Sequence, residues 1–166
     1  MKRQTLTAAI ALIALIVSLD QWTKHWITVA LPFEESDPIM VIDQFLHITH
    51  HRNYGASWGL FQGQTVFFTV VTILALGVFT FFAKDMAFKA KPVYSTGLTL
   101  LIGGTVGNFI DRLRLGYVVD FIDTYIFGYN FPIFNVADMA LTVGMALFAF
   151  DIIILEPIRM KENTDG

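Results

Sequence analysis

Four aspartates stand out because they lie in or beside long apolar segments, where an ionised carboxylate carries a large desolvation penalty. They are Asp20, Asp111, Asp120 and Asp138. Two carboxylates that share one site cannot both ionise easily, so one of them keeps its proton. The ionised group can then accept a proton from water, while the protonated group donates to a carbonyl oxygen. Such a pair could hydrolyse a peptide bond without a metal ion or a covalent intermediate.

The residue pattern does not settle which two aspartates form the pair. Asp138 opens an expected helix, and its partner is either Asp120 or Asp111. Asp120 has apolar neighbours on both sides, which favours a raised pKa. Asp111 is followed by Arg112 and is expected to pair with that guanidinium. The residues alone favour Asp120 slightly and leave Asp111 open. A purely structural role for all three, as helix caps or ion-pair partners, is the other interpretation.

Other chemistries have less support in this sequence. There is no cysteine, which excludes disulfides, thiol nucleophiles and thiolate metal sites. Neither a serine elbow nor an H-E-x-x-H pair occurs. His47, His50 and His51 suggest a metal site at first, but neighbouring residues of a strand point to opposite faces. No carboxylate at helical spacing completes such a site, so we expect no metal ion and no other cofactor.

The composition predicts the elements that must position these residues. The chain is 55% hydrophobic and 15% charged, whereas soluble domains carry about 25% charged residues. Four segments approach the roughly 20 mostly apolar residues that a membrane helix needs. They lie at about residues 6–30, 66–83, 93–110 and 136–157. The net charge of -3 and the lack of a basic stripe exclude nucleic acid as a partner.

The ends of the spans predict the orientation of the chain. If the N-terminus is cytoplasmic, the inner side holds seven basic residues, namely Lys2, Arg3, Lys84, Lys89, Lys91, Arg159 and Lys161. The outer segments then hold Arg52, Arg112 and Arg114. This bias places both termini inside. The first span lacks a clear cleavage site and ends in Trp22 and Trp26, so it is expected to stay as an anchor. Asp151 is expected to snorkel or to face a partner helix.

Two outer segments, at about residues 31–65 and 111–135, contain most of the unusual polar residues. Residues 39–51 are rich in strand formers and predict a small sheet on the membrane surface. A turn is expected at Tyr54, Gly55 and Gly59. Gly116 should end the third helix, and Asn135 should cap the fourth. The expected fold is therefore one all-α membrane domain over residues 1–166. It has four transmembrane helices, a small extracytoplasmic β-sheet cradle and a short outer loop or helix.

Five short segments of this chain, taken together, resemble one known family. They are DQWTK at residues 20–24, NYGASWGLF at 53–61, GGTVGNFIDR at 103–112, GYVVDFID at 116–123 and FNVAD at 134–138. Each alone is a weak signal. In this order, on a four-span frame of this length, they resemble the lipoprotein signal peptidases of bacteria (signal peptidase II).

This resemblance implies an aspartic endopeptidase of the bacterial cytoplasmic (inner) membrane, with its active site at the outer face. Its implied partners are membrane lipid and prolipoproteins, which it would cleave just before a cysteine that already carries a diacylglyceryl group. The cyclic peptide antibiotic globomycin is implied as an inhibitor, with its serine hydroxyl between the two catalytic aspartates. A monomer is expected.

The resemblance also decides between the candidate pairs. The family's catalytic aspartates fall on Asp120 and Asp138. Its supporting residues, expected to contact substrate or to hold the pair in place, map onto Asp20, Lys24, Asn53, Gly55, Asn108, Asp111, Arg112 and Asn135. The chain departs from many relatives at Ala56-Ser57 and at Met139, and Tyr54 stands at a variable position. These departures bear on the shape of the pocket and remove no proposed catalytic group.

Two other functional classes compete with the peptidase. The aspartates could serve as the ion or proton relay of a small transporter or channel, or as packing residues of a scaffold without catalysis. Transporters place their sites near the bilayer midplane, often within internal repeats. Here the carboxylates gather toward one face, and no repeat is present.

Overall fold

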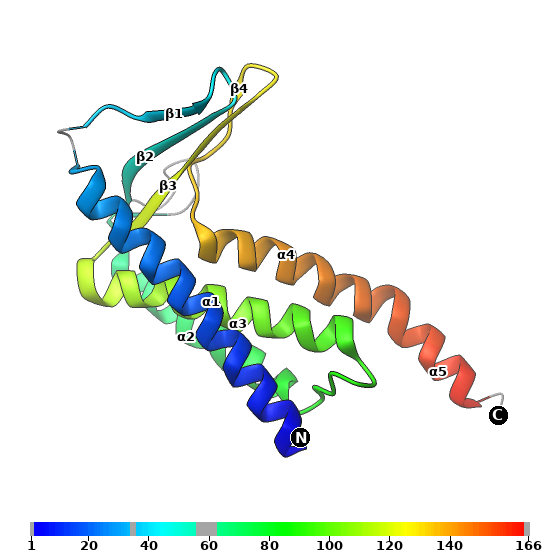
Figure 1. Ribbon diagram of the computed structural model, residues 1–166. Helices are drawn as coiled ribbons and strands as arrows, with labels where there is room; N and C mark the ends of the chain where they lie inside the picture. The colour runs from blue at the N-terminus through cyan, green and yellow to red at the C-terminus, as the bar shows by residue number, and fades with distance from the viewer. Residues whose placement is uncertain (1, 34–35, 56–62, 165–166) are drawn as a thin grey trace.

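The computed structural model describes residues 2–33, 36–55 and 63–164. The helices are α1 (Arg3–Ala30), α2 (Thr65–Ala83), α3 (Pro92–Leu115), α4 (Val136–Phe150) and α5 (Glu156–Thr164), with a π-helical turn, η2 (Asp151–Leu155), between the last two. The strands are β1 (Ile39–Ile42), β2 (Leu46–Asn53), β3 (Val118–Ile126) and β4 (Tyr129–Asn130). Figure 1 shows the sheet at one end of the helices and both chain termini toward the opposite end.

The four predicted spans are confirmed as helices. Arg3–Ala30, Val66–Ala83, Pro92–Leu115 and Val136–Glu162 are each long and apolar enough to cross a membrane. The third ends at Leu115, directly before Gly116, the residue predicted to end it. It ends there because Gly116 has a φ of 79°, a left-handed conformation that closes the helix at little steric cost.

Helix α3 is the central helix of the bundle. In its most apolar 18-residue window, 61% of the residues are buried, against 17%, 6% and 17% in the other three spans. The other helices leave large apolar side chains exposed, including Leu15, Leu74 and Ile153. An exposed apolar surface of this extent around a buried helix is what a lipid environment requires.

Small residues allow α3 and α4 to pack closely. A Cβ atom at Gly104 would lie 2.5 Å from the carbonyl oxygen of Ala137, and one at Gly144 would lie 2.9 Å from that of Gly97. Membrane helices commonly approach each other through such small residues. This contact fixes the start of α4 beside the C-terminal half of α3, where the candidate site lies.

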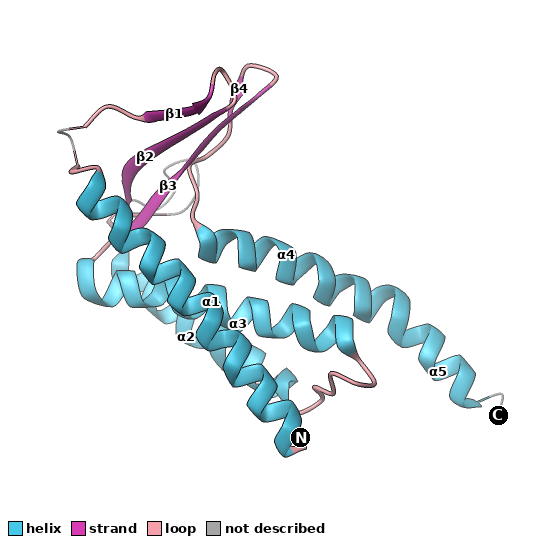
Figure 2. Cartoon of the chain, in the orientation of Figure 1, coloured by secondary structure: helices cyan, strands magenta, loops and turns pink. Residues whose placement is uncertain are grey.

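The four strands form one antiparallel sheet in the order β1-β2-β3-β4 (Figure 2). The sheet predicted over residues 39–51 is confirmed. The second outer segment is more than a loop, because Val118–Ile126 forms the longest strand and pairs with β2. The register places His51 opposite Asp120. The predicted turn at Gly59 lies outside the described residues.

The fourth span continues as helix to Thr164, beyond its predicted end near residue 157. The π-helical turn begins at Asp151, which is fully buried. Its carboxylate accepts from the backbone N–H of Tyr94 at 3.2 Å and pairs with Arg159 at 2.5 Å. Asp151 therefore faces the neighbouring helix α3, one of its two predicted environments.

Candidate active site

Asp120 and Asp138 come together from a strand and a helix. Asp120 lies on β3, and Asp138 lies in the first turn of α4. Both line one cavity of about 760 Å³. Asn135 begins α4 because its side chain accepts from the Asp138 N–H at 2.9 Å, while the Asp138 carboxylate accepts from the Asn135 N–H at 3.2 Å. This reciprocal capping box fixes the position of Asp138.

The Asp120 carboxylate is buried and held by two amides. The Asn53 side chain donates to Oδ2 at 2.8 Å, and the Asn135 side chain donates to Oδ1 at 2.6 Å. Burial, and after it the nearby charge of Asp138, raises the pKa of Asp120 to about 7, although the hydrogen bonds from both amides lower it. A carboxyl group with this pKa exchanges a proton readily near neutral pH.

An amide network connects the two aspartates. Asn108 of α3 donates to Oδ1 of Asp138 at 2.7 Å. The Asn135 amide nitrogen, already bonded to Asp120, also lies 3.1 Å from the Asn108 carbonyl oxygen. Asn108 and Asn135 therefore orient both carboxylates toward one cavity. The described part of the chain shows no cation within ion-pair distance of either one.

A buried lysine supports this network from α1. The Lys24 ammonium lies 2.9 Å from Asp20, 3.0 Å from Asp111 and 2.9 Å from the side-chain oxygen of Asn108. Asp20 also accepts from the backbone N–H of Ala137 at 2.9 Å, so it ties α1 to the first turn of α4. Lys24 thus neutralises two buried carboxylates and orients Asn108 in one arrangement.

The predicted partner of Asp111 was wrong. Its ion pair is with Lys24, and among the described residues no ion pair, with side-chain nitrogen and oxygen within 4.0 Å, joins it to Arg112. Adjacent residues of a helix do not face each other, which explains the difference. Asp111 also accepts from the backbone N–H of Val119 at 3.1 Å and so holds the start of β3. Arg112 instead lies over the ring of Phe68 at 5.0 Å and lines the cavity.

The remaining predicted site residue, Gly55, is buried and lines the cavity. Its N–H donates to the side-chain oxygen of Asn53 at 3.0 Å, which orients the Asn53 amide toward Asp120. All ten predicted residues therefore belong to one connected region. Asp120, Asp138, Asn53, Gly55, Asn108 and Arg112 line the cavity, whereas Asp20, Lys24, Asp111 and Asn135 act from behind it.

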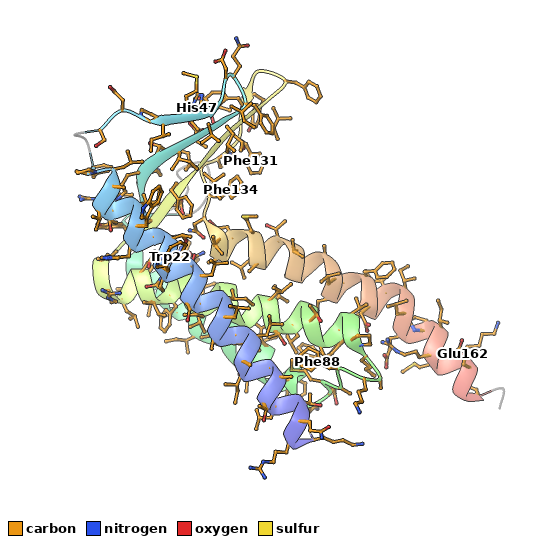
Figure 3. The ribbon with its side chains drawn as sticks, viewed as in Figure 1. Trp22, His47, Phe88, Phe131, Phe134 and Glu162 are labelled. Atoms are coloured by element: carbon orange, nitrogen blue, oxygen red, sulfur yellow. The ribbon has the colours of Figure 1, made fainter. Side chains whose placement is uncertain are left out.

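Sequence reasoning missed two parts of this region. Gln21 donates to Asp111 at 2.8 Å, and its position inside the DQWTK segment was the available signal. The apolar wall of the cavity includes Phe131 and Phe134, which Figure 3 shows between the sheet and the start of α4. In a sequence with 55% hydrophobic residues, the pattern alone does not show which apolar side chains form the wall of a cavity.

The three histidines of β2 do not converge. His50 donates from Nδ1 to the backbone oxygen of Leu31 at 2.8 Å, and His47 lies 4.0 Å from Asp123. His51 as a whole is exposed, but its ring is partly buried. This partial burial, and after it the charge of the neighbouring His50, lowers the pKa of His51. Within the described ranges, no group of three or more His, Asp or Glu side chains could hold a metal ion.

Known proteins resemble this chain over most of its length. A family model described as signal peptidase (SPase) II matches residues 12–154. The lipoprotein signal peptidase of Halalkalibacterium halodurans is 44% identical over 149 residues, covering 89% of this chain and 93% of that protein. The lipoprotein signal peptidase of Staphylococcus aureus is 44% identical over 147 residues, covering 88% of each.

Solved structures agree with the sequence matches. One bacterial membrane enzyme superposes with a TM-score of 0.78 at 42% identity, covering 88% of this chain and 87% of the other. A second has a TM-score of 0.77 at 42% identity, covering 89% and 94%. With a family model over most of its length and relatives of this identity, the chain belongs to the signal peptidase II family.

Proposed function

We propose that this chain is an aspartic endopeptidase that removes signal peptides from diacylglyceryl-modified prolipoproteins, with Asp120 and Asp138 as its catalytic residues. One observation carries the proposal. The buried Asp120 and the half-buried Asp138 line the same largely apolar cavity, and amides hold both carboxylates. In contrast, Lys or Arg side chains hold the buried carboxylates of Asp20, Asp111 and Asp151. Family membership supports the reaction class and the prolipoprotein substrate.

The two carboxyl groups divide the chemistry of peptide hydrolysis between them. The ionised carboxylate takes a proton from a water molecule as its oxygen attacks the scissile carbonyl carbon. The protonated carboxyl group donates to the carbonyl oxygen, which becomes a hydroxyl in the tetrahedral intermediate. That intermediate then breaks its C–N bond. The protonated carboxyl group gives its proton to the departing amine, and the ionised carboxylate accepts a proton from one hydroxyl of the intermediate, which becomes the carbonyl oxygen of the new carboxyl group. The pair shares one proton before and after the reaction.

The apolar wall of the cavity fits a substrate that stays in the membrane. Its wall includes Phe68, Val71 and Ala75 of α2 and Leu141 and Val143 of α4, together with the loop before α4. A signal helix and a diacylglyceryl group are both apolar and lower their free energy in such surroundings. Globomycin would occupy the same cavity and compete with substrate, with its hydroxyl between the two carboxylates.

We further propose that the sheet end faces the outside of the bacterial cytoplasmic membrane and that both termini are cytoplasmic. Basic residues concentrate in the terminal regions and in the loop between α2 and α3, at the end away from the sheet (Figure 1). The aspartates would then lie where the lipidated cysteine meets the aqueous phase, at the outer boundary.

The test is cleavage of a synthetic diacylglyceryl-modified precursor by the purified protein. Asp120→Asn and Asp138→Asn should each lower turnover by about 10³-fold or more, because neither variant can cycle a proton between two carboxyl groups. Asp123→Asn is the matched control, since Asp123 is a buried aspartate of the same strand that does not line the cavity. It should retain turnover.

All three variants should keep the thermal unfolding midpoint of the parent to within a few degrees. Full turnover by folded Asp120→Asn or Asp138→Asn would overturn the mechanism. Globomycin should block the parent enzyme, and chelators should leave its turnover unchanged.

A further inference from the structure

A second cavity lies behind the sheet, on the side away from the aspartate pair. It has a volume of about 460 Å³ and lies between the outer end of α1, the end of α3 and strand β2. We call it the basic cavity, after the basic side chains that line it: Lys24, His25, His50, Arg52 and Arg114. It shares no lining residue with the cavity that holds Asp120 and Asp138.

Strand geometry explains why the two cavities are separate. Successive side chains of a strand point to opposite faces. On β2, Asn53 lines the aspartate cavity and the preceding Arg52 lines the basic cavity. On β3, Asp120 and the preceding Val119 divide in the same way. The sheet therefore presents a catalytic face and a basic face.

The basic cavity carries an excess of positive charge. Lys24, Arg52 and Arg114 line it together with one carboxylate, that of Asp111, and Asp20 pairs with Lys24 from behind the cavity. Asp111 is already bonded to Lys24. Among the described residues, neither Arg52 nor Arg114 has an acidic partner within 4.0 Å, so two guanidinium groups remain for an anion. Arginine suits phosphate because its planar fork donates two parallel hydrogen bonds.

Two residues that line this cavity, Arg52 and His50, each have an enclosed polar atom without a hydrogen-bond partner among the described residues. The Nε of Arg52 is enclosed without a hydrogen bond, while its guanidinium is held 4.2 Å over the ring of Phe33 and 5.1 Å over that of Tyr117. The Nε2 of His50 is enclosed in the same way. Because Nδ1 of that ring donates to Leu31, a neutral His50 can accept at Nε2. A ligand with both an anionic oxygen and a hydroxyl group would supply an acceptor for the buried donor and a donor for the buried acceptor.

The level of the basic cavity relative to the membrane surface points to a lipid as the source of that ligand. His25 of the cavity lies between Trp22 and Trp26 in α1, whose side chains are 65% and 52% exposed. Exposed tryptophans near the end of a membrane helix mark the level of the lipid headgroups. We propose that the basic cavity binds the headgroup of an anionic phospholipid, a phosphodiester with a neighbouring hydroxyl group, from the outer leaflet.

The test measures lipid retention by the full-length protein. Native mass spectrometry of protein from mixed micelles should show preferential retention of phosphatidylglycerol over phosphatidylcholine. Arg52→Gln and Arg114→Gln should each weaken the binding of phosphatidylglycerol by about tenfold, the effect of losing one charge-assisted contact. The matched control is Lys84→Gln, which removes an exposed cation at the opposite end of the bundle and should retain the parent affinity.

The outcomes separate the proposal from its alternatives. Arg114 is exposed, so Arg114→Gln keeps the test valid even if Arg52→Gln unfolds. Equal retention of the two lipids would overturn the proposal, as would parent affinity for phosphatidylglycerol in folded Arg114→Gln. Displacement of phosphatidylglycerol by inorganic phosphate at similar concentration would assign the site to free phosphate and would also overturn it. Lipid retention is independent of catalysis, so these results stand apart from those for Asp120 and Asp138.

Discussion

Buried aspartates occur at both ends of this helix bundle, and their partners differ. Asp151, at the end of the termini, is fully buried and touches Arg159 at 3.1 and 2.5 Å. Asp120, at the end of the sheet, is 1% exposed and receives hydrogen bonds from the amides of Asn53 and Asn135. Similar burial therefore occurs with a cation in one place and with neutral donors in the other.

The difference determines what each carboxylate can do. A cation at contact distance keeps a carboxylate ionised, and the pair then serves structure. Amides compensate part of the free-energy cost of desolvating the carboxylate. They leave the carboxyl group able to hold a proton, as the pKa of about 7 for Asp120 illustrates. The sheet end contains both kinds side by side, since Lys24 holds Asp20 and Asp111 just behind the amide network.

The largest effect is expected where a cation is removed from behind the pair. Lys24→Met would leave Asp20 and Asp111 buried without a counter-charge, since Lys24 is only 3% exposed. Removing one partner of a buried ion pair costs about 3–5 kcal/mol. Asn108 would also lose the contact that orients it toward Asp138, so turnover should fall strongly. Thermal unfolding in detergent and precursor cleavage measure the two effects.

A triple variant identifies the cause of that loss. Adding Asp20→Asn and Asp111→Asn to Lys24→Met removes both uncompensated charges. If electrostatics is responsible, the triple variant should unfold at a higher temperature than Lys24→Met alone. A further decrease, equal to the sum of the separate effects, would show that packing and hydrogen bonds determine the stability of this cluster.

A smaller effect is expected at the other end of the bundle. Arg159→Met removes the cation from Asp151, but its side chain is 24% exposed, so water can replace part of the contact. We expect a loss of about 1–3 kcal/mol in the free energy of unfolding. Precursor cleavage, measured below the new unfolding temperature, should keep the parent rate.

Lys161→Met is the matched control for Arg159→Met. It removes an exposed cation from the same helix and should leave stability unchanged. A marked decrease in the turnover of folded Arg159→Met would contradict the division between a structural end and a catalytic end.

The parts of the molecule that sequence reasoning predicted are those that depend on local pattern. Apolar run length gave the four spans, strand formers gave the sheet at residues 39–51, and Gly116 marked the end of α3. Asn135 was predicted as a cap, and its side chain does accept from Asp138 at 2.9 Å. Each of these features depends on residues that are close together in the sequence.

The parts that were missed depend on contacts between distant segments. Lys24 contacts Asn108, 84 residues later, and no local pattern shows that their helices meet at this point. The proximity of Asp111 and Arg112 in sequence suggested an ion pair that the helix geometry prevents. The basic face of the sheet was missed for the same reason, because it becomes visible only when β2 and α1 are placed together.

The smallest effect is expected from one amide of the pair. Asn53 donates to the ionised form of Asp120 and so lowers the pKa of that carboxyl group. Catalysis requires one proton on the pair, so activity should fall as pH rises past about 7, the value to which the pKa of Asp120 is raised. Asn53→Ala removes a donor that favours the charged form. The alkaline limb of the cleavage profile should therefore move upward, by about half to one pH unit.

Asn130→Ala is the control for this last variant, because Asn130 is exposed on β4 and does not line the cavity. Its profile should match that of the parent. A downward shift of the alkaline limb in Asn53→Ala would mean that Asn53 stabilises the protonated form of the pair. An unchanged limb would mean that the proton required for cleavage is not held where Asn53 can influence it. Either result would mean that the amide donors do not act on the proton of Asp120 as described. Their presence would then not explain how Asp120 differs from the aspartates that are bound to cations.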